Sequence, residues 1–400
     1  MPTLASTSRA QLRYILESVF GTIPGSGNPN NVRMTGESLT FGLGTESSKE
    51  IRSDRQITDL VQVSAEASGG VNFELSYNEH DDIIEAALQG TWAVYGVAGV
   101  GATFSGTYTA TTITAAVAPT GASAFTTLAL GQWIQLNAPA NVNDKKWVKI
   151  HASTAITSTV ITLDAGTPLT ANGPTAGSWV SASRLVNGTT QRSFSLEKAF
   201  NDINQFFAYR GMTNSKMSMQ FQSGAIVTGA FDFMGKDAIR AAATQLPGAP
   251  IASLTFDVMN AVSGVGQLFE GGAPLTSTFI KSVSFDMDNK LRGQSALANM
   301  GNVGVGSGSL DVKGTMEVYL ADGTLYDKFV TNAASSLSLR ATDAAGNGYV
   351  ISFPKMKYSD AKVVAGSIDQ DAMLSLPFTA IMDPVTGKTI LVDRAGVAAV

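Results

Sequence analysis

Cysteine is absent from this chain of 400 residues, and histidine occurs only twice, as His80 and His151. Without cysteine, the chain can form no disulfide bond, no thiolate metal site and no cysteine nucleophile. The two histidines are far apart in the sequence and lack the spacing of a zinc site. We therefore expect no catalytic residues, no metal ion and no cofactor, and we expect that the protein is not an enzyme.

Charged residues are also scarce, at 15% of the chain, and the net charge is −5. A surface basic enough to hold nucleic acid tightly through counterion release is therefore not expected. No stretch approaches the roughly 18 consecutive apolar residues of a membrane span, and the N-terminal residues lack the apolar run of a signal peptide. A glycosidase with paired acids is the enzymatic alternative, which the scarcity of clustered acids disfavours.

The hydrophobic content of 44% and the 40 glycines instead indicate a folded chain rich in β-structure. The stretch 192–236 shows this most clearly, because apolar and polar residues alternate over 193–196, 217–221 and 227–233. Three glycines separate these runs, namely Gly211, Gly224 and Gly235. The pattern predicts a meander of short antiparallel strands joined by turns.

The order of motifs within this stretch resembles the tail tube (major tail) protein family of long-tailed bacteriophages with non-contractile tails. The motifs are S-F-S-L-E-K at 193–198, an aromatic strand that ends at Gly211, and G-A-F-D-F-M-G-K at 229–236. The resemblance extends more weakly over residues 34–90 and 275–394. It does not cover about 93–185.

The resemblance implies a structural subunit that assembles with copies of itself into stacked rings and forms the conduit for genome ejection. It also implies assembly in the cytoplasm of the bacterial host and a final location in the virion tail. The implied partners are other copies of the chain, the tape measure protein and further tail proteins. Double-stranded DNA would pass through the lumen without tight binding, and no membrane insertion is expected.

Residues 1–33 are expected to form an N-terminal arm. Residues 9–20 could be an amphipathic helix with Leu12 and Ile15 on one face, but their aromatic and β-branched residues also suit an extended segment. We favour the extended arm, because residues 21–31 form a tether rich in Gly, Pro and Asn that would let the arm reach a neighbouring subunit.

The pattern from residue 34 onward predicts a series of strands, since apolar residues recur at every second position. Glycines interrupt the pattern and mark its breaks. The expected elements are a strand at 38–43, a loop at 44–50, a strand from Ile51 onward and an alternating strand at 71–77.

A helix is expected at 81–88, directly after this group of strands. Its start is marked by Glu79, Asp81 and Asp82, because carboxylates suit the free N–H groups and the positive end of a helix. A hydrolytic metal cluster around His80 is the alternative interpretation of the same acids. The helix start explains them without any ligand, so we disfavour the metal cluster.

Between residues 93 and 185 the composition changes abruptly. Charged residues become rare there, and all four tryptophans of the chain lie in this segment or at its edge. Short apolar runs separated by Pro, Asn and Gly turns are typical of a small β-barrel or sandwich, so we expect an inserted β domain that decorates the outside of the particle. The tryptophans also support an alternative function, a virion or adhesin protein that binds glycans on the host surface.

The segment that follows residue 236 is rich in alanine. We expect a short helix within residues 237–249, which ends near Pro247, and a strand at 254–257. Residues 251–277 are expected to form a connection to the last part of the chain, which is glycine-rich at 264–274.

The sequence also indicates an internal duplication. The strand motif at 38–41 corresponds to the one at 282–285, and the helix at 81–88 corresponds to one after Asp322. Chance similarity between β meanders is the alternative. The first repeat would comprise residues 34–92 and 186–250, and the second repeat residues 278–400.

The expected fold class is therefore all-β. It consists of two tail-tube-type antiparallel β-sandwich or half-barrel repeats, each with one short helix, plus the small inserted β domain. The resembled family stacks sixfold rings, and some members carry two tube folds per chain in trimeric rings of pseudo-sixfold symmetry. Two repeats here imply three chains per ring, whereas six chains follow if the duplication is illusory.

Two sets of residues are candidates for roles in the conduit and in assembly. Acids opposite the apolar face of a strand would line the lumen and repel DNA phosphates, unless they face outside solvent: Glu74, Asp232, Asp286, Asp288 and Glu317. Contacts between rings are expected in the N-terminal arm and in the loops 44–50 and 301–311. The residues expected to make them are Arg9, Leu12, Tyr14, Ile15, Phe20, Glu46, Lys49 and Glu50.

Overall fold

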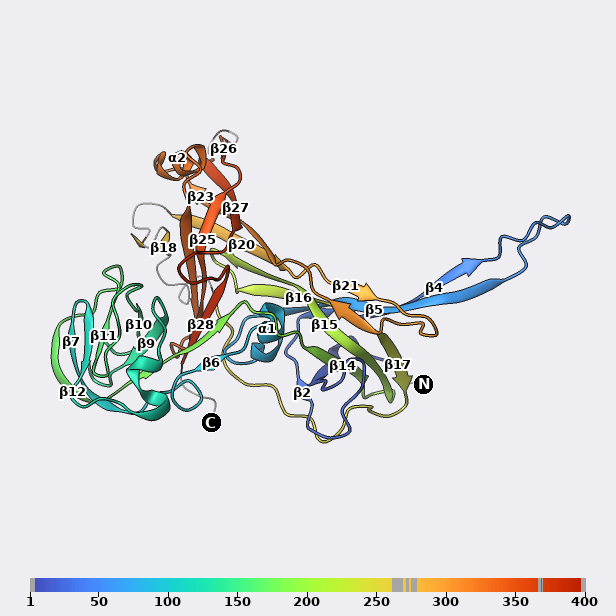
Figure 1. Ribbon diagram of the computed structural model, residues 1–400, viewed down its shortest axis with the longest axis horizontal. Coiled ribbons are helices and arrows are strands. Elements are labelled where there is room, and N and C mark those ends of the chain that lie inside the picture. The colour runs from blue at the N-terminus through green and yellow to red at the C-terminus, as the bar shows by residue number, and fades with distance from the viewer. Residues whose placement is uncertain are drawn as a thin grey trace.

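The computed structural model describes residues 4–260, 269–270, 273–274, 279–365, 368 and 370–396. Within these residues the regular structure is almost entirely antiparallel β, which confirms the expected all-β fold class. Figure 1 shows a central body from which a long hairpin projects on one side, with a separate group of strands on the other side.

The first part of the chain supplies the 3-10 helix η1 (Thr7–Arg9), β1 (Ala10–Leu16), β2 (Asn30–Asn31), β3 (Gly36–Glu37), β4 (Thr40–Ser47), β5 (Leu60–Glu74), α1 (Asp81–Leu88), β6 (Ala93–Val94), β13 (Ser183–Val186), β14 (Ser193–Phe200), β15 (Gln205–Gln222), β16 (Thr228–Gly235) and β17 (Asp237–Ala241). The last part supplies β18 (Phe269–Glu270), β19 (Ala273–Pro274), β20 (Ile280–Asp288), β21 (Arg292–Gln294), β22 (Gly304–Gly306), β23 (Asp311–Tyr319), α2 (Thr324–Val330), β24 (Ser335–Thr342), β25 (Gly348–Tyr358), β26 (Lys362–Val364), β27 (Met373–Ala380) and β28 (Leu391–Ala395).

The segment between these two parts has a sheet and a hydrophobic core of its own. Its core residues all lie within 95–182. The strands that lead into and out of it, β6 and β13, pair with each other, and β13 also pairs with β28. The elements are β7 (Phe104–Thr109), β8 (Thr112–Ala115), η2 (Gly121–Ser123), η3 (Phe125–Thr127), β9 (Trp133–Asn137), β10 (Lys146–Lys149), β11 (Val160–Thr162) and β12 (Asn172–Ser181).

One antiparallel ladder of six strands runs through both main parts of the chain, in the order β5–β16–β15–β20–β23–β27. The long strand β15 links two layers, because its first half pairs with β14 and β17 and its second half pairs with β16 and β20. Alternate side chains of the ladder, such as Phe73, Phe231 and Phe285, are buried in a single main core that includes α1. The other face of the ladder is polar and open.

The strand pairings of the first part recur in the last part in the same order. The pairing β4–β5 corresponds to β20–β23, and the pairing β5–β16 to β23–β27. The pairing β14–β15 corresponds to β24–β25. The pairings of β15 with β16 and β17 correspond to those of β25 with β27 and β28. A register shift also recurs, between Phe194 and Leu196 in β14 and between Ser335 and Leu337 in β24. The duplication itself stays a prediction, which these recurring pairings support.

The N-terminal segment is extended, as favoured over the helix, but it is a strand of its own subunit and not a free arm. β1 pairs along its whole length with β14. Leu12 and Tyr14 are buried in the main core, and Glu17 accepts hydrogen bonds from Ser195 Oγ at 2.6 Å and from the Gly211 N–H at 2.9 Å. Release of this segment would expose these apolar side chains and unpair the edge of β14. The free energy that both changes would cost keeps the segment in place.

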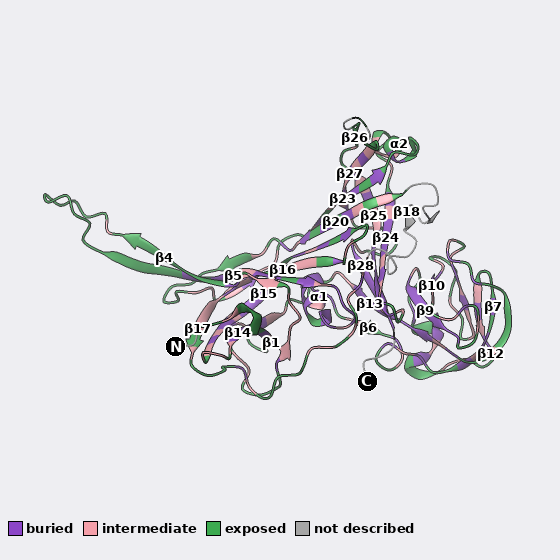
Figure 2. Ribbon diagram, turned by 180° about the vertical axis from the view of Figure 1, so that it is seen from behind, coloured by how far each residue is buried: buried purple, intermediate pink, exposed green. Residues whose placement is uncertain are grey.

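The strands expected at 38–43 and from Ile51 have other bounds in the structure. β4 continues to Ser47 and β5 begins at Leu60, so the two strands form a projecting hairpin whose turn is residues 48–59 (Figures 1 and 2). β5 also continues through Gly69, where a break was expected. Gly69 has a φ of +133°, and a Cβ there would lie 2.3 Å from the Ser38 carbonyl oxygen, so this glycine permits the neighbouring strand to approach.

The helix expected within residues 237–249 is wrong, because residues 237–241 form the strand β17. β17 pairs with the first half of β15, and the ion pair between Arg210 and Asp237 (2.6 Å) links the two strands. Pairing against an existing sheet outweighs the helix propensity of alanine. The strand expected at 254–257 is also wrong, since this stretch runs as an irregular segment. Isolated bridges occur only beside it, from Ile251 to Asn30, from Val258 to Ser76 and from Asn260 to Ile226.

Candidate functional site

The five acids expected to line a lumen lie on one face of the six-strand ladder. Asp232 shows the arrangement, because its neighbours Phe231 and Phe233 are buried in the core and its own side chain points to the open face. The pairing registers place all five on this face, on four different strands: Glu74 on β5, Asp232 on β16, Asp286 and Asp288 on β20, and Glu317 on β23.

Lysines that the sequence analysis missed lie between these acids. Lys216 on β15 lies opposite both Asp232 and Asp288, with its Nζ 3.5 Å from Asp288 Oδ2. Lys313 on β23 donates a hydrogen bond of 2.8 Å to Asp311, which lowers the pKa of that carboxyl. The open face is therefore mixed in charge and not purely acidic. The register between strands is needed to place Lys216 beside Asp232 and Asp288, which are distant in sequence. Lys313 lies two residues from Asp311 on the same strand, so alternation along that strand could have revealed it.

Figure 2 shows the projecting hairpin as exposed along most of its length. Leu43 on β4, Leu60 and Val61 on β5, and Ile51 and Ile57 in the turn are all exposed. Exposed apolar residues on a long strand pair are typical of an interaction surface, because they would otherwise be a liability for aggregation.

The three charged residues expected to join rings lie at the outer end of this hairpin. Glu46 and Lys49 form an exposed ion pair with an N–O distance of 3.5 Å. Glu50 accepts a hydrogen bond of 3.0 Å from Thr58 Oγ1 across the turn. All three are exposed, so a neighbouring subunit can reach them.

The N-terminal residues expected between rings lie in a different setting. Leu12, Tyr14 and Ile15 are buried in the subunit, Phe20 is half-buried, and Arg9 is exposed. In this conformation a neighbouring subunit cannot reach the three buried side chains. The role of these residues in contacts between rings stays a prediction. The exposed residues among them can contact a neighbouring subunit without any rearrangement.

The loop at 301–311, also expected between rings, lies against its own subunit. Asn302 Nδ2 donates a hydrogen bond of 3.2 Å to the Gly235 carbonyl, and Gln191 Nε2 donates one of 2.8 Å to the Val305 carbonyl. Part of the loop is the strand β22, which pairs with β21.

The start of α1 joins segments from distant parts of the chain. Asp81 accepts a hydrogen bond from Tyr349 Oη and forms an ion pair with Arg394, both from the last part of the chain. Asp82 accepts a hydrogen bond of 3.0 Å from Tyr14 Oη on β1. Burial raises the pKa of Tyr14 and of Tyr349, so both hydroxyls stay protonated and can donate. These acids fasten α1 to its neighbours, although they were expected to cap the helix.

Glu79 and His80 complete this junction. Glu79 accepts hydrogen bonds from the backbone N–H groups of Arg33 (3.1 Å) and Leu254 (2.7 Å). His80 is buried against Phe73, with 4.6 Å between the ring centroids, and its Nε2 donates to the Arg33 carbonyl at 3.1 Å. Burial lowers the pKa of His80 to about 4. Among the described residues, no group of three or more His, Asp or Glu side chains is arranged to hold a metal ion.

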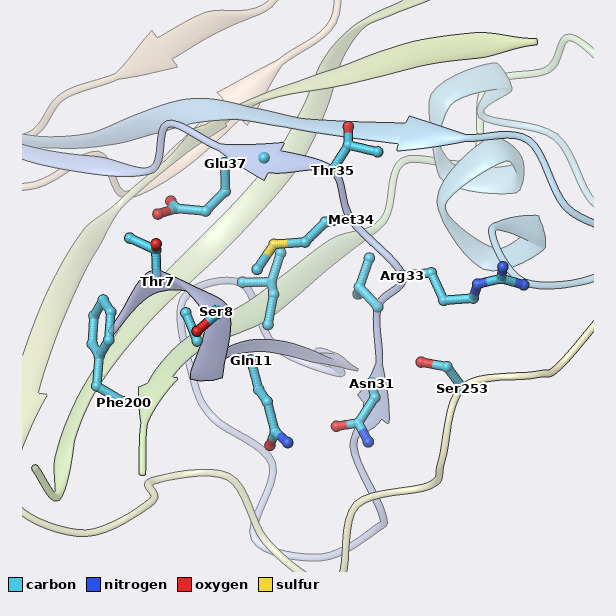
Figure 3. Close-up of a pocket in the computed structure, with 14 residues that line it drawn as sticks. Thr7, Ser8, Gln11, Asn31, Arg33, Met34, Thr35, Glu37, Phe200 and Ser253 are labelled. Carbon is cyan, nitrogen blue, oxygen red and sulfur yellow. The ribbon is translucent and has the colours of Figure 1, made fainter. Parts of the chain in front are cut away.

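A groove of about 760 Å³ lies beside β3, between η1, the segment 31–37 and Ser253 (Figure 3). Its charged side chains are already engaged with the protein. The Arg33 guanidinium donates to the Phe256 carbonyl at 2.7 Å, and Glu37 forms an ion pair of 2.7 Å with Lys198. The groove thus offers shape and backbone edge but no combination of catalytic groups.

Tryptophans hold the inserted segment against the last part of the chain. Trp133 and Trp147 form a buried cluster with Val350 and Ala395. Trp92 lies under the Arg394 guanidinium, 4.9 Å from the ring centroid. These three rings are committed to packing and cannot also serve as platforms for a sugar. The main support for a glycan-binding function is thereby weakened.

No helix within the described residues is both long enough and apolar enough to span a membrane.

Comparison with known proteins agrees with this architecture. No curated protein matches the chain. The model of the family described as phage tail tube protein matches residues 7–380, which covers both main parts and the segment between them. The chain therefore belongs to the phage tail tube protein family.

Proposed function

We propose that three copies of this chain close into a ring and that such rings stack to enclose the conduit for genome ejection. As a tail tube protein, the chain is a structural subunit of the virion tail that associates with copies of itself and with other tail proteins. The observation that carries the proposal is the recurrence of one set of strand pairings within a single ladder. Two tube repeats per chain give six repeats from three chains, and hence a ring of pseudo-sixfold symmetry.

The open face of the ladder is proposed to line the lumen. It is continuous across both repeats and carries Glu74, Asp232, Asp286, Asp288 and Glu317. Acidic side chains repel DNA phosphates across a hydrated gap, so that double-stranded DNA passes without being held. Lys216 and Lys313 form pairs with neighbouring acids, which limits their attraction for the phosphates.

The projecting hairpin is proposed to make the contacts between rings. Its outer end lies away from the body (Figure 1) and combines exposed Ile51 and Ile57 with the charged residues Glu46, Lys49 and Glu50. Apolar side chains would supply the buried area in such a contact and the charges its orientation. The tape measure protein is the proposed occupant of the lumen before DNA enters, and assembly is proposed to occur in the host cytoplasm.

Electron microscopy of the concentrated purified protein in negative stain tests this function. Tubes with a regular axial repeat and three chains per ring are the expected result, and the mass of dissociated rings counts the chains. A chain that stays monomeric at high concentration contradicts the tube function. Rings of six chains would leave the tube function intact but refute the trimeric arrangement.

A further inference from the structure

The six-strand ladder continues beyond β5 with β3 and β4, and beyond β27 with β26. The outer edges of these added strands have no strand beside them in the described part of the chain. On one side, β3 and β4 pair only with β5. On the other side, β26 pairs only with β27. Figure 1 shows β4 and β26 at different ends of the subunit, so they cannot pair within one chain. Open edges of this kind are templates for pairing with another chain.

The same chain contains a closed counterpart of this arrangement. The second half of β15 lies between β16 and β20, and it joins the two repeats along seven residue pairs, from Lys216 opposite Asp288 to Gln222 opposite Ser282. The side chains at Met217, Met219, Phe285 and Met287 are buried where these strands meet. This junction is the model for how one repeat meets the next.

The recurring registers assign a counterpart to each residue of the junction. Glu74 lies opposite Thr228, and Tyr319 lies opposite Met373, at the ends of eight matching pairs in β5–β16 and β23–β27. Because Ala67 then corresponds to Val312, the partners of these two residues, Phe41 and Met287, also correspond. The register thus moves the correspondence expected from the motifs at 38–41 and 282–285 by two residues.

The same reasoning applies on the other edge of the ladder. Gly229 corresponds to Leu374 by the same eight pairs. Their partners are Met219 and Val363, so Val363 on β26 is the counterpart of Met219 on β15. β26 thus stands in the second repeat where the second half of β15 stands in the first.

We propose that β26 of one copy pairs antiparallel with β3 and β4 of a second copy, in the register of the junction between β15 and β20. Lys362 then lies opposite Thr40, because their counterparts Ser218 and Asp286 lie opposite each other. Val363 lies opposite Leu39 and Ala361 opposite Phe41. The inference rests on the proposed ring and names the two strands that close it.

The direction of the backbone groups agrees with this pairing. The Asn289 N–H donates to the Ser215 carbonyl, so the odd-numbered residues of β20 face β15. The Ser38 N–H donates to the Gly70 carbonyl on β5, so Leu39 and Phe41 direct their own N–H groups to the open edge. These residues are the counterparts of Phe285 and Met287, which face β15. The open edge of β4 therefore presents donors at the positions where β20 presents them to β15.

The exposure of apolar side chains at the two edges also supports pairing with a second copy. Phe41 is 40% exposed and Val363 is 47% exposed, whereas their counterparts Met287 and Met219 are 0% and 3% exposed. Apolar positions that are covered at the junction within the chain are thus uncovered at the two open edges. Pairing with a second copy removes both from water.

Three side chains cover part of the edge in the separate subunit. The Leu39 N–H donates to Glu37 Oε2 at 2.9 Å, and the Leu39 carbonyl accepts from Tyr209 Oη at 3.1 Å and from Lys198 Nζ at 3.4 Å. When the strand of the second copy pairs at this position, backbone hydrogen bonds replace these bonds to side chains. The groove beside β3 is the space into which the neighbouring strand continues (Figure 3).

Cysteine crosslinking of assembled tubes tests the register, since the natural chain has no cysteine. Directly opposed residues in an antiparallel pair have Cα atoms about 4.5–5.5 Å apart, which suits a disulfide. The variant with Thr40→Cys and Lys362→Cys should form covalent multimers up to the size of one ring under mild oxidation. The control with Thr40→Cys and Ser375→Cys moves one cysteine a strand further, to about 10 Å, and should remain monomeric in denaturing gels.

Each outcome decides between the alternatives. Tubes without the Thr40–Lys362 crosslink, or with crosslinking only in the control, overturn this inference and leave the tube function standing. A natural chain that never forms tubes overturns both. If the cysteine variants do not fold, hydrogen exchange on the natural chain replaces them. The amides of Phe41 and Leu43 should then exchange at least about tenfold more slowly in tubes than in the monomer, and equal rates refute the pairing.

Discussion

Arg184 and Asp393 form a buried ion pair that fastens β13 to β28. Arg184 Nε lies 2.6 Å from Asp393 Oδ1, and Arg184 Nη2 lies 2.8 Å from Asp393 Oδ2. Asp393 Oδ2 also accepts a hydrogen bond of 3.0 Å from the backbone N–H of Trp133 in the inserted segment. One carboxylate therefore holds together the exit strand of the insertion, the insertion itself and the second repeat.

Removal of this carboxylate should destabilise the protein strongly. Asp393→Ala leaves the Arg184 guanidinium buried without its countercharge, which typically costs about 3–5 kcal/mol of unfolding free energy. Urea denaturation followed by tryptophan fluorescence would measure the loss. Asp54→Ala is the matched control, because it breaks the exposed ion pair with Arg52 and should leave the transition unchanged. Equal transitions for the two variants would show that Asp393 does not fasten the insertion.

The stability of the subunit should fall in mild acid because of His80. Its pKa is about 4 in the folded chain, against about 6.5 when unfolded, since burial disfavours the charged ring. The unfolded chain therefore binds a proton between these values and the folded chain does not. The contribution of His80 is complete above about pH 6.5, and about 3 kcal/mol of it is lost by pH 4.

A comparison of two histidine variants measures this contribution. His80→Gln keeps a donor for the Arg33 carbonyl but binds no proton, so its unfolding free energy should depend less on pH between 4 and 6.5 than that of the natural chain. His151→Gln keeps His80 and should retain the steep dependence. Parallel curves for the natural chain and His80→Gln would contradict the assignment.

Charge reversal on the open face of the ladder should impair DNA passage without affecting the tube. In the variant Asp286→Lys with Asp288→Lys, two more lysines join Lys216 and Lys313 on this face, and the lumen would attract phosphates. Virions should carry tails of normal length but eject DNA more slowly, and the defect should lessen at high salt. Asp257→Lys, at an exposed position outside the ladder, is the control. Normal ejection from intact tails would place this face away from the DNA.

The sequence predicted local features better than those that depend on distant strands. The bounds of α1, Asp81 to Leu88, were predicted because helix periodicity and an acidic start are local signals. The helix at 237–249 was wrong because the partner that makes β17 a strand lies in β15, and no local signal reveals it. Alternation along single strands identified the five acids, since a period of two directly separates the faces of a strand.

The neighbours of those acids on other strands could not be predicted in the same way. Lys216 meets Asp288 only because β15 of one repeat pairs with β20 of the next, 72 residues further along the chain by subtraction of their numbers. The projecting hairpin was missed for a related reason. Gly44 was taken as the start of a loop, although a glycine inside a strand can mark a β-bulge, as the register shift after Gly44 indicates.

Shortening of the hairpin should abolish tube growth and leave the subunit folded. Ser47 and Leu60 lie opposite each other, so an Asn-Gly turn can replace residues 48–59 without altering the register. The turn is fully exposed apart from Ser48, and its loss should change the unfolding free energy by no more than about 0.5 kcal/mol. Sedimentation and electron microscopy should find rings or small oligomers in place of tubes. The double variant Ile51→Ser with Ile57→Ser keeps the hairpin length and should weaken growth by removing the apolar contact alone.

Deletion of residues 4–20 should act in the opposite way, on folding before assembly. It removes Leu12 and Tyr14 from the core and leaves Ser195 and the Gly211 N–H without their acceptor Glu17. Loss of two large buried side chains and a strand typically costs more than about 5 kcal/mol, which is comparable to the whole stability of many domains. The truncated chain should be insoluble or unfolded by circular dichroism. A folded, soluble truncation that fails only to polymerise would restore the N-terminal segment as an arm between subunits.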